Sequence, residues 1–375
     1  RHNLKPFFFQ MGCYLLWRCL FLVLSVVCPM FLSSSGCFME ERAALMDIRS
    51  WLVNAESKAP SSWGDGGDCC SWERIMCDNT THRVSRLNLF QTYQENLQYC
   101  EDECPNLNLT IFSSFRGLQL LNFSGHHACL QNFEGLQGLS KLKYLDLSCN
   151  SFQGGGIPGS VGKLVSLEVI NLNGNNIGGT LHSTDFRNLR NLRELHLGSS
   201  QLRGSLPASI FALPRLEYLD LSYNLFEGHI PINLSRNLRL RELYLTFNRL
   251  SGGLPASLFA LLRLAYLDLS DNLFQGHILT NSSWNLRELH LGSNQLSGTL
   301  PASVFALPCL EYLDLSYNLF KGQIHINSSW NLRELHLRSN QLSGRVPASV
   351  FALSCLEYLD LSENLLQGHI PISSS

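Results

Sequence analysis

Leucines recur along most of this chain in the pattern L-x-x-L-x-L-x-x-N, and the positions between them are mainly polar or aromatic. Full copies begin every 22 to 25 residues from Leu142 to Leu356, and looser copies begin at Val84 and Leu118. A pattern that repeats at a fixed interval of this length is typical of stacked repeats rather than of independent domains. The sequence therefore predicts one array of about twelve units over residues 84–375.

Each unit is expected to contain one short β-strand. In the copy LEYLDLSYN at 310–318, the leucines point to one side of an extended chain, and Glu311, Tyr312 and Asp314 point to the other. One unit cannot bury its leucines alone, so neighbouring units must pair strands about 4.8 Å apart in a parallel sheet and share an apolar column behind it. We predict an α/β repeat solenoid.

An asparagine ends nearly every copy, where the chain turns away from the strand. A buried amide can satisfy backbone groups in its own turn and in the next, so we interpret these asparagines as a structural ladder and not as catalytic groups. Ser200, His126 and Thr92 interrupt the ladder. We expect those three turns to be the weaker ones.

Two units together form a longer period, because residues 286–318 and 332–364 differ at only five positions. Each unit continues as L-x-G-x-[I/L/V]-P, in which glycine permits a turn and proline fixes an extended return. With this continuation, the array resembles plant-type extracellular leucine-rich repeats. The resemblance implies a leucine-rich repeat horseshoe with the parallel sheet on its concave face.

Residues 37–83 precede the array and carry a different signature. CFMEERAALMDIRSWL places its apolar residues on one helical face, and Cys69 and Cys70 follow as an adjacent pair. Adjacent cysteines rarely bond to each other, so these two should reach different partners. The segment resembles the disulfide-bonded N-terminal cap of plant extracellular leucine-rich repeat proteins, and the resemblance implies disulfides joining Cys37 with Cys69 and Cys70 with Cys77. A zinc site is the alternative, but the expected histidine spacing is missing, and we expect no metal.

The remaining cysteines lie within the array. Cys100 and Cys104 flank acidic residues in an insertion near 91–112, and we expect them to close a small loop. Cys129 and Cys149 are expected to pair across neighbouring repeats. Two further cysteines, at equivalent positions in duplicated units, are expected to be buried free thiols: Cys309 and Cys355.

Residues 1–10 precede the first methionine and are interpreted as an upstream or non-native leader. Residues 11–36 contain an apolar run that ends in small residues, which is typical of a secretory signal peptide. An uncleaved membrane anchor is the alternative, but Arg18 shortens the apolar core. Export agrees with six Asn-x-Ser/Thr sites at which we expect glycosylation: Asn79, Asn108, Asn122, Asn233, Asn281 and Asn327.

The composition and the motifs of the chain limit which classes of function it can have. The net charge is −2 and only 15 % of residues are charged, so the chain has no basic surplus for a nucleic-acid partner. No Ser-His-Asp ordering, paired-carboxylate motif, phosphate loop or metal-spaced histidine cluster stands out. We therefore expect neither enzymatic activity nor a cofactor.

Within its family, the chain most resembles plant receptor-like proteins, which are leucine-rich repeat receptors without a kinase. The resemblance implies a ligand-binding ectodomain that recognises a peptide, protein or glycan on the concave face and acts with partner receptor kinases in defence or developmental signalling. The alternative is a secreted inhibitor of cell-wall-degrading enzymes, similar to the polygalacturonase-inhibiting proteins.

The end of the chain bears on where the protein acts. No capping segment or membrane helix follows LLQGHIPISSS, so we expect a truncated product or fragment. A full-length form would sit on the extracellular side of the plasma membrane. A chain that truly ended here would be secreted or apoplastic.

A ligand would contact the outward positions of the strands. Opposite charges on adjacent strands support a sheet, so the charged columns at these positions are interpreted first as self-satisfying ladders. The alternative is a ligand site in which exposed aromatic and charged side chains act as anchors. The candidate residues are Tyr218, Tyr223, Tyr244, Phe247, Tyr266, His290, Tyr312, Asp314, Tyr317, His336 and Arg338.

Overall fold

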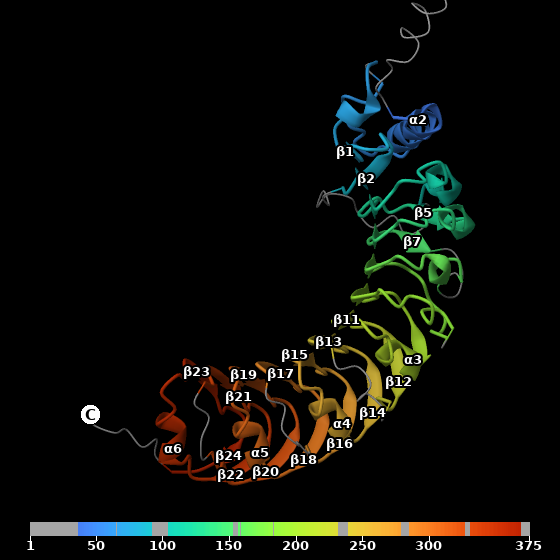
Figure 1. Ribbon diagram of the computed structural model, residues 1–375. Helices are drawn as coiled ribbons and strands as arrows, with labels where there is room; N and C mark the ends of the chain where they lie inside the picture. The colour runs from blue at the N-terminus through green and yellow to red at the C-terminus, as the bar shows by residue number, and fades with distance from the viewer. Residues whose placement is uncertain are drawn as a thin grey trace, which may run out of the picture.

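The computed structural model is a curved stack of repeats with the cap at its N-terminal end (Figure 1). The structure describes residues 37–64, 66–91, 104–152, 157, 159–182, 184–231, 239–278, 285–326 and 331–368. Outside the described residues lie the expected leader and signal peptide, and also Thr92, Cys100, Asn233, Asn281 and Asn327. No helix among the described residues is both long enough and apolar enough to span a bilayer.

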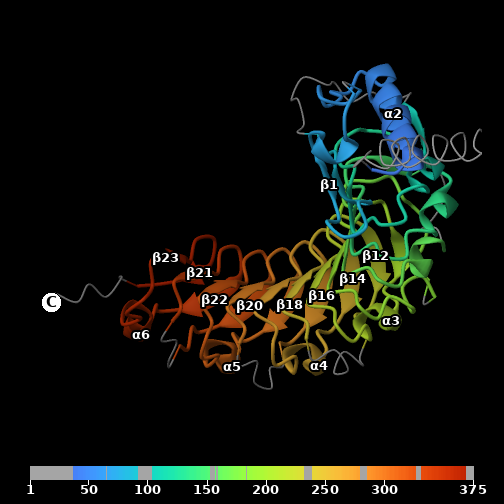
Figure 2. The same ribbon diagram turned by 45° about the horizontal axis from the view of Figure 1, so that its top comes forward.

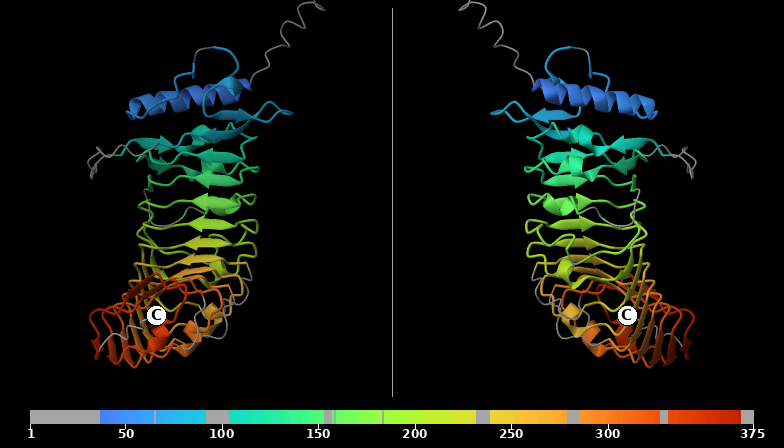
Figure 3. Two further views of the ribbon diagram at one scale, coloured as in Figure 1. Left: turned by 90° about the vertical axis from the view of Figure 1, so that its left-hand side faces the viewer. Right: turned by 90° about the vertical axis from the view of Figure 1, so that its right-hand side faces the viewer.

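Thirteen strands of the described residues form one sheet on the concave side of the stack (Figures 1 and 3). β1 (Ile75–Cys77) pairs antiparallel with β2 (Val84–Asn88), and the later neighbours are parallel. In each parallel pair the central apolar residues stand opposite each other, as Leu289 and Leu313 do. The predicted parallel sheet on the concave face is confirmed. Its other strands, in order, are β4 (Leu120–Asn122), β6 (Tyr144–Asp146), β8 (Val169–Asn171), β9 (Glu194–His196), β11 (Tyr218–Asp220), β13 (Glu242–Tyr244), β15 (Tyr266–Asp268), β17 (Glu288–His290), β19 (Tyr312–Asp314), β21 (Glu334–His336) and β23 (Tyr358–Asp360).

The return segments form two smaller parallel sheets. A second sheet contains β10 (Arg203–Ser205), β12 (Leu225–Gly228), β14 (Arg249–Gly252), β16 (Leu273–Gly276), β18 (Gln295–Gly298), β20 (Leu319–Gly322), β22 (Gln341–Gly344) and β24 (Leu365–Leu366). The third contains β3 (Asn106–Asn108), β5 (Cys129–Gln131) and β7 (Ser151–Phe152). Gly252 shows why glycine ends these strands, because its φ is +82° and an added Cβ would overlap the ring of His229.

Short helices complete the outer part of the units. Figure 2 shows the α-helices along one edge of the stack. They are α3 (Ala208–Phe211), α4 (Ala256–Phe259), α5 (Ala302–Phe305) and α6 (Ala348–Phe351). Earlier units have 3₁₀ turns instead, at η2 (Leu109–Phe112), η3 (Phe133–Leu136) and η4 (Val161–Lys163). Each α-helix begins directly after a proline, whose fixed φ suits the start of a helix.

Leucines and phenylalanines fill the space between the concave sheet and the outer segments. Leu310, Leu313 and Leu315 are at most 1 % exposed, as the pattern predicts. A buried side chain of this size contributes about 1.5–3 kcal/mol relative to an exposed one. Behind the leucines stand fully buried phenylalanines, including Phe226, Phe259, Phe274, Phe305 and Phe320.

The asparagines form the predicted ladder. Nδ2 of Asn272 donates to the carbonyl of Leu245 in the preceding unit (2.9 Å) and to that of Leu269 in its own unit (3.2 Å). Its Oδ1 accepts from the backbone N–H of Leu250 (3.0 Å). One amide therefore closes its own turn and ties two units together, which accounts for its recurrence without any catalytic role.

Two of the three interruptions keep a bond to the preceding unit. Oγ of Ser200 donates to the carbonyls of Leu172 (3.2 Å) and Gly198 (3.0 Å). Nε2 of His126 lies 2.7 Å from the carbonyl oxygen of Leu89. The expectation that these turns are weaker stays a prediction.

The cap places one long helix, α2 (Met39–Asn54), across the end of the stack. Leu45, Ile48 and Leu52 on its inner face are buried against the first units. Trp63 and Trp72 stack beside them with their ring centroids 6.2 Å apart. These side chains cover the apolar column at this end.

A buried carboxylate fixes the helix to the sheet. Glu41 is fully buried and accepts from the backbone N–H of Val84 at 3.0 Å and from Arg83 at 3.3 Å. Burial raises the pKa of Glu41, and the bonds from Val84 and Arg83 act in the opposite direction. The paired charge thus sets the position of α2 on β2.

Three disulfides join described cysteines. Two of them lie in the cap and are those that the resemblance implied: Cys37 with Cys69 and Cys70 with Cys77. The third joins Cys104 with Cys129. It shows that two predictions were wrong, the loop from Cys104 to Cys100 and the pair of Cys129 with Cys149. Asn106 on β3 stands opposite Cys129 on β5, and this register brings the Cα atoms of Cys104 and Cys129 to 5.3 Å.

Three described cysteines are free. Cys149 is exposed. Cys309 and Cys355 are free, as predicted, but they are half-buried rather than buried. Each stands one position before an inward-pointing leucine, where the chain is still entering the stack from outside.

Candidate ligand-binding face

The structure divides the candidate residues between two parts of the concave face. Seven lie on the strands themselves: Tyr218, Tyr244, Tyr266, His290, Tyr312, Asp314 and His336. Four lie in the turns that follow the strands: Tyr223, Phe247, Tyr317 and Arg338. The strand group faces a continuous surface, and the turn group borders it along one edge.

Eight aromatic rings on the strands form a continuous stack, which we call the ring ladder. It contains His196, Tyr218, Tyr244, Tyr266, His290, Tyr312, His336 and Tyr358, with successive ring centroids 4.3 to 5.2 Å apart. Every step is diagonal, because the ring stands at the end of one strand and at the beginning of the next. For example, β17 and β19 pair His290 with Asp314, but the ring of His290 stacks on Tyr312. Each ring face is thus largely covered by the next ring, and the ring edges and polar tips remain for a ligand.

The polar tips of the ring ladder already have acidic neighbours. Tyr244 donates its hydroxyl to Glu242 at 2.9 Å, and Nε2 of His290 lies 3.3 Å from a carboxylate oxygen of Glu288. Burial, assisted by Asp314, raises the pKa of Tyr312 to about 12. The pKa of Tyr266 is also raised, chiefly by burial. These tyrosines therefore stay neutral, and they can act as hydrogen-bond donors.

The aspartates that alternate with the histidines are partly used by the turns. Oδ1 of Asp314 accepts from the backbone N–H of Ser316 (2.8 Å) and from its hydroxyl (2.6 Å). The other carboxylate oxygen lies over Gly292, where an added Cβ would be 2.8 Å away. One oxygen of Asp314 thus holds the turn, and the other is available to the concave face.

The turn group includes the most exposed aromatic side chains of the face. Tyr223 and Phe247 are 55 % and 45 % exposed, and their rings stack at 4.5 Å. Both residues have positive φ, which costs a side chain with a Cβ of the order of 1 kcal/mol. Tyr317 is also exposed and lies near Arg338, which pairs with Glu363. Tyr223, Phe247 and Tyr317 thus form an aromatic edge beside the ring ladder.

The described glycosylation sites differ in position. Asn79 is exposed in the cap. Asn122 ends β4 on the concave sheet, where its Oδ1 accepts from the N–H and hydroxyl of Ser124. Asn108 is exposed at the end of β3, and its Oδ1 accepts from the backbone N–H of Thr110. Glycosylation at these three positions stays a prediction.

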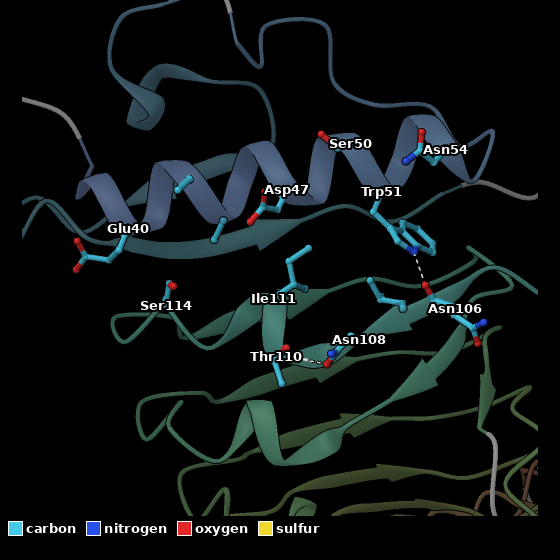
Figure 4. A pocket seen from close by; sticks show the side chains of 13 residues that line it. Glu40, Asp47, Ser50, Trp51, Asn54, Asn106, Asn108, Thr110, Ile111 and Ser114 are labelled. Atoms are coloured by element: carbon cyan, nitrogen blue, oxygen red, sulfur yellow. Dashed lines mark hydrogen bonds between the residues drawn. The ribbon is translucent and has the colours of Figure 1, made fainter.

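Asn108 also borders an open groove of about 740 Å³ between α2 and the first unit (Figure 4). Trp51 closes one end, where its indole N–H donates to the carbonyl of Asn106 at 2.7 Å. None of the proposed ligand-binding residues lines this groove. Among the described residues, no group of three histidine, cysteine or acidic side chains is placed to hold a metal ion.

Comparison with models of known families shows which family the chain belongs to. A family model described as a leucine-rich repeat region matches residues 101–324, which is more than half of the chain. The chain belongs to the leucine-rich repeat family. A model of the leucine-rich repeat N-terminal domain matches residues 39–78, and single-repeat models match 331–353 and 355–375.

The relatives of this leucine-rich repeat chain include plant receptor-like proteins. Receptor-like protein 9b of Arabidopsis thaliana is 33 % identical over 180 residues, which cover 46 % of this chain and 18 % of that protein. The chain thus spans about a fifth of the length of the curated relatives it matches.

Solved structures give the same result at the level of the fold. A TDR receptor is similar at a TM-score of 0.64 and 32 % identity, over 70 % of this chain and 46 % of that one. PEPR1-AtPEP1 is similar at a TM-score of 0.65 and 29 % identity, over 86 % of this chain and 49 % of that one. The repeat stack therefore has the fold of these two solved structures.

Proposed function

We propose that this chain is the ligand-recognising ectodomain of a plant cell-surface receptor-like protein, and that its concave face binds an extracellular peptide. The observation that carries the proposal is the ring ladder on a continuous parallel sheet. It supplies a rigid surface lined by neutral tyrosine donors, histidines and acidic acceptors. The similarity to receptor-like proteins and to receptor structures supports it.

A peptide suits this surface better than a glycan does. Sugars commonly need an open aromatic face, and the faces of the ring ladder cover one another. A peptide backbone can instead use the donors and acceptors at the ring edges, with apolar side chains against Tyr223 and Phe247. In this proposal the chain acts by binding in the extracellular space, and partner receptor kinases transmit the signal.

The first experiment selects binders and then blocks the face with a glycan. A random-sequence peptide library is selected against the secreted protein, and affinities are measured by fluorescence anisotropy. Asp268→Asn creates the glycosylation sequence Asn-Leu-Ser in the middle of the concave sheet, at the position where β4 naturally carries Asn122 in the sequence Asn-Phe-Ser. We expect the glycan to reduce affinity for the selected peptides by at least tenfold.

The matched control is Asp268→Asn combined with Ser270→Ala, which keeps the amide but removes the glycosylation sequence. It should bind like the unmodified protein. Intact mass establishes whether the glycan is present, and thermal unfolding establishes that both variants fold. A selection that yields no binders, or binders that tolerate the glycan, would contradict the proposal.

A further inference from the structure

A column of alternating charges runs along the concave sheet, one position before each strand. We call it the charge column. Successive members are joined through their backbones, since each N–H donates to the carbonyl of the preceding member, as Glu217 does to Arg193 at 2.8 Å. Its members are Lys143, Glu168, Arg193, Glu217, Arg241, Ala265, Arg287, Glu311, Arg333 and Glu357.

Opposite charges in the column pair with one another on either side of Ala265. Towards the cap, Arg193 lies 3.8 Å from Glu168 and 3.3 Å from Glu217. On the other side, Arg287 lies 2.7 Å from Glu311, and Arg333 pairs with Glu357. These ion pairs are the self-satisfying ladder that the sequence suggested.

Ala265 breaks the alternation. The equivalent position in the sister units LEYLDL holds a glutamate, whereas this unit reads LAYLDL. Arg241 and Arg287 therefore flank an uncharged position. Arg241 reaches Glu217 only at 4.0 Å, and Glu217 already serves Arg193. The side chains of Arg241 and Arg287 are 61 % and 63 % exposed, so the column has surplus positive charge where both are open to solvent.

The geometry over Ala265 fits a carboxylate. Ala265 donates its N–H to the carbonyl of Arg241, and Arg287 donates to that of Ala265, each at 2.8 Å. With strands about 4.8 Å apart, the two arginine Cα atoms are roughly 10 Å from each other, and both guanidinium groups can reach one group between them. Guanidinium binds carboxylate through charge-assisted hydrogen bonds in a planar fork.

We propose that the gap over Ala265 is a carboxylate subsite, which takes an acidic side chain or the C-terminal carboxylate of a bound peptide. This inference rests on the proposed function, because it names a chemical feature of the same ligand. The bound carboxylate replaces the glutamate of the sister units and completes the charge column.

Neighbouring groups select for a single carboxylate. Glu242 and Glu288 lie on the strands beside the two arginines, and they accept from Tyr244 and approach His290 respectively. Their negative charges disfavour a ligand with several adjacent anionic groups, such as a polyuronate. The unit of Arg241 carries Tyr244 and Phe247 where its sister units carry histidine and serine, so one carboxylate next to apolar or aromatic residues is the preferred peptide feature.

The test uses the peptides selected against the unmodified protein. Ala265→Glu fills the subsite with the residue of the sister units, and Ala265→Gln matches its size without its charge. We expect Ala265→Glu to weaken the selected peptides by about tenfold or more, and Ala265→Gln by no more than about threefold. Replacing the peptide's acidic residue by its amide, or amidating its C-terminus, should weaken binding to the unmodified protein by the same factor as Ala265→Glu does. The amidated peptides should bind Ala265→Glu no more weakly than they bind the unmodified protein.

A gain-of-site variant completes the test. Glu311→Ala removes the glutamate between Arg287 and Arg333 and should create a second subsite. Peptides selected against this variant should therefore contain more acidic residues. The glycan on β15 could block peptides that bind Ala265→Glu as tightly as they bind the unmodified protein. That result would overturn the subsite and leave the proposed function standing. Tighter Ala265-dependent binding of an oligogalacturonate than of any selected peptide would overturn the peptide assignment.

Discussion

Single residues show how far the repeat pattern can be altered without loss of its contacts. His126 occupies a position that asparagine fills in most units, and it is only 6 % exposed. Its ring stacks on Phe123 with centroids 4.1 Å apart, and its two nitrogens approach Leu89 and Ser57. Burial lowers the pKa of His126 to about 4, and the charges of Arg74 and His127 act in the same direction. The folded protein therefore holds this imidazole neutral.

This environment predicts a loss of stability in acid. The folded-state pKa of about 4 lies below the ordinary value of 6.5, so the stabilisation is complete above pH 6.5 and is lost as the pH falls towards 4. The shift corresponds to about 3 kcal/mol over that range. Urea unfolding from pH 7 to 4 measures it. His126→Asn, which restores the ladder residue, should flatten the curve, and an unchanged pH dependence in that variant would contradict the assignment.

At the level of elements, the concave strands are held by more than leucines. The ring ladder runs across strands β9 to β23 and joins each strand to the next through side chains on the solvent side. Cross-strand aromatic pairs contribute about 0.5–1.5 kcal/mol each beyond the area they bury. The same residues that are candidates for ligand contact therefore also stabilise the sheet, and the two roles need separate measurements.

Tyr266 is the residue at which to separate them. Tyr266→Ala removes the stacks with Tyr244 (4.5 Å) and His290 (5.1 Å), and should lower the free energy of unfolding by about 1–3 kcal/mol. Tyr266→Phe keeps both stacks and should stay within about 0.5 kcal/mol of the unmodified protein. Denaturant unfolding of the two variants gives the comparison. Equal losses would show that the hydroxyl, and not the stacked ring, matters here.

The whole molecule is a linear assembly, in which each unit touches mainly its neighbours. Its sheets follow chain order from one end to the other, and the cap lies against the first units, as the bond from Trp51 to Asn106 shows. In such an array, stability is approximately a sum of the units and the interfaces between neighbours. A disturbance at one end is therefore expected to fade along the stack.

Removing a cap disulfide tests this locality. Cys37→Ser with Cys69→Ser should destabilise the cap by about 3 kcal/mol, since the bridge closes a loop of 32 residues. Hydrogen exchange should become faster in α2 and β1, while the amides from β13 onward keep the rates of the unmodified protein. Faster exchange along the entire concave sheet would instead indicate a single cooperative unit.

The sequence predicted what depends on periodicity. The spacing of Leu310, Leu313 and Leu315 determines which side chains are buried, and the regular interval determines that neighbouring strands are parallel. The cap disulfides followed from resemblance. The bridge from Cys104 to Cys129 did not, because it depends on how β3 lies against β5, and an irregular insertion separates that first unit from the pattern.

The candidate face was predicted as a set of positions but not as an arrangement. The sequence placed Tyr312 and His290 on the concave side, but their stacking is diagonal and cannot be read from a column of equivalent positions. Ala265 was visible as an exception in the charge column. Its consequence became apparent only when the ion pairs showed that Arg241 and Arg287 each reach a glutamate on their far side and have none between them.

The alternation of the ring ladder also restricts how such a gene can change length. Strands that begin with a tyrosine ring alternate with strands that end in an aromatic ring, usually histidine, as β19 and β21 do. Unequal exchange involving an odd number of units would bring two like strands together, with His next to His and Arg next to Arg. Exchange involving an even number of units keeps the two kinds of strand alternating across the concave face. Viable length variants of this array should therefore differ by even numbers of units.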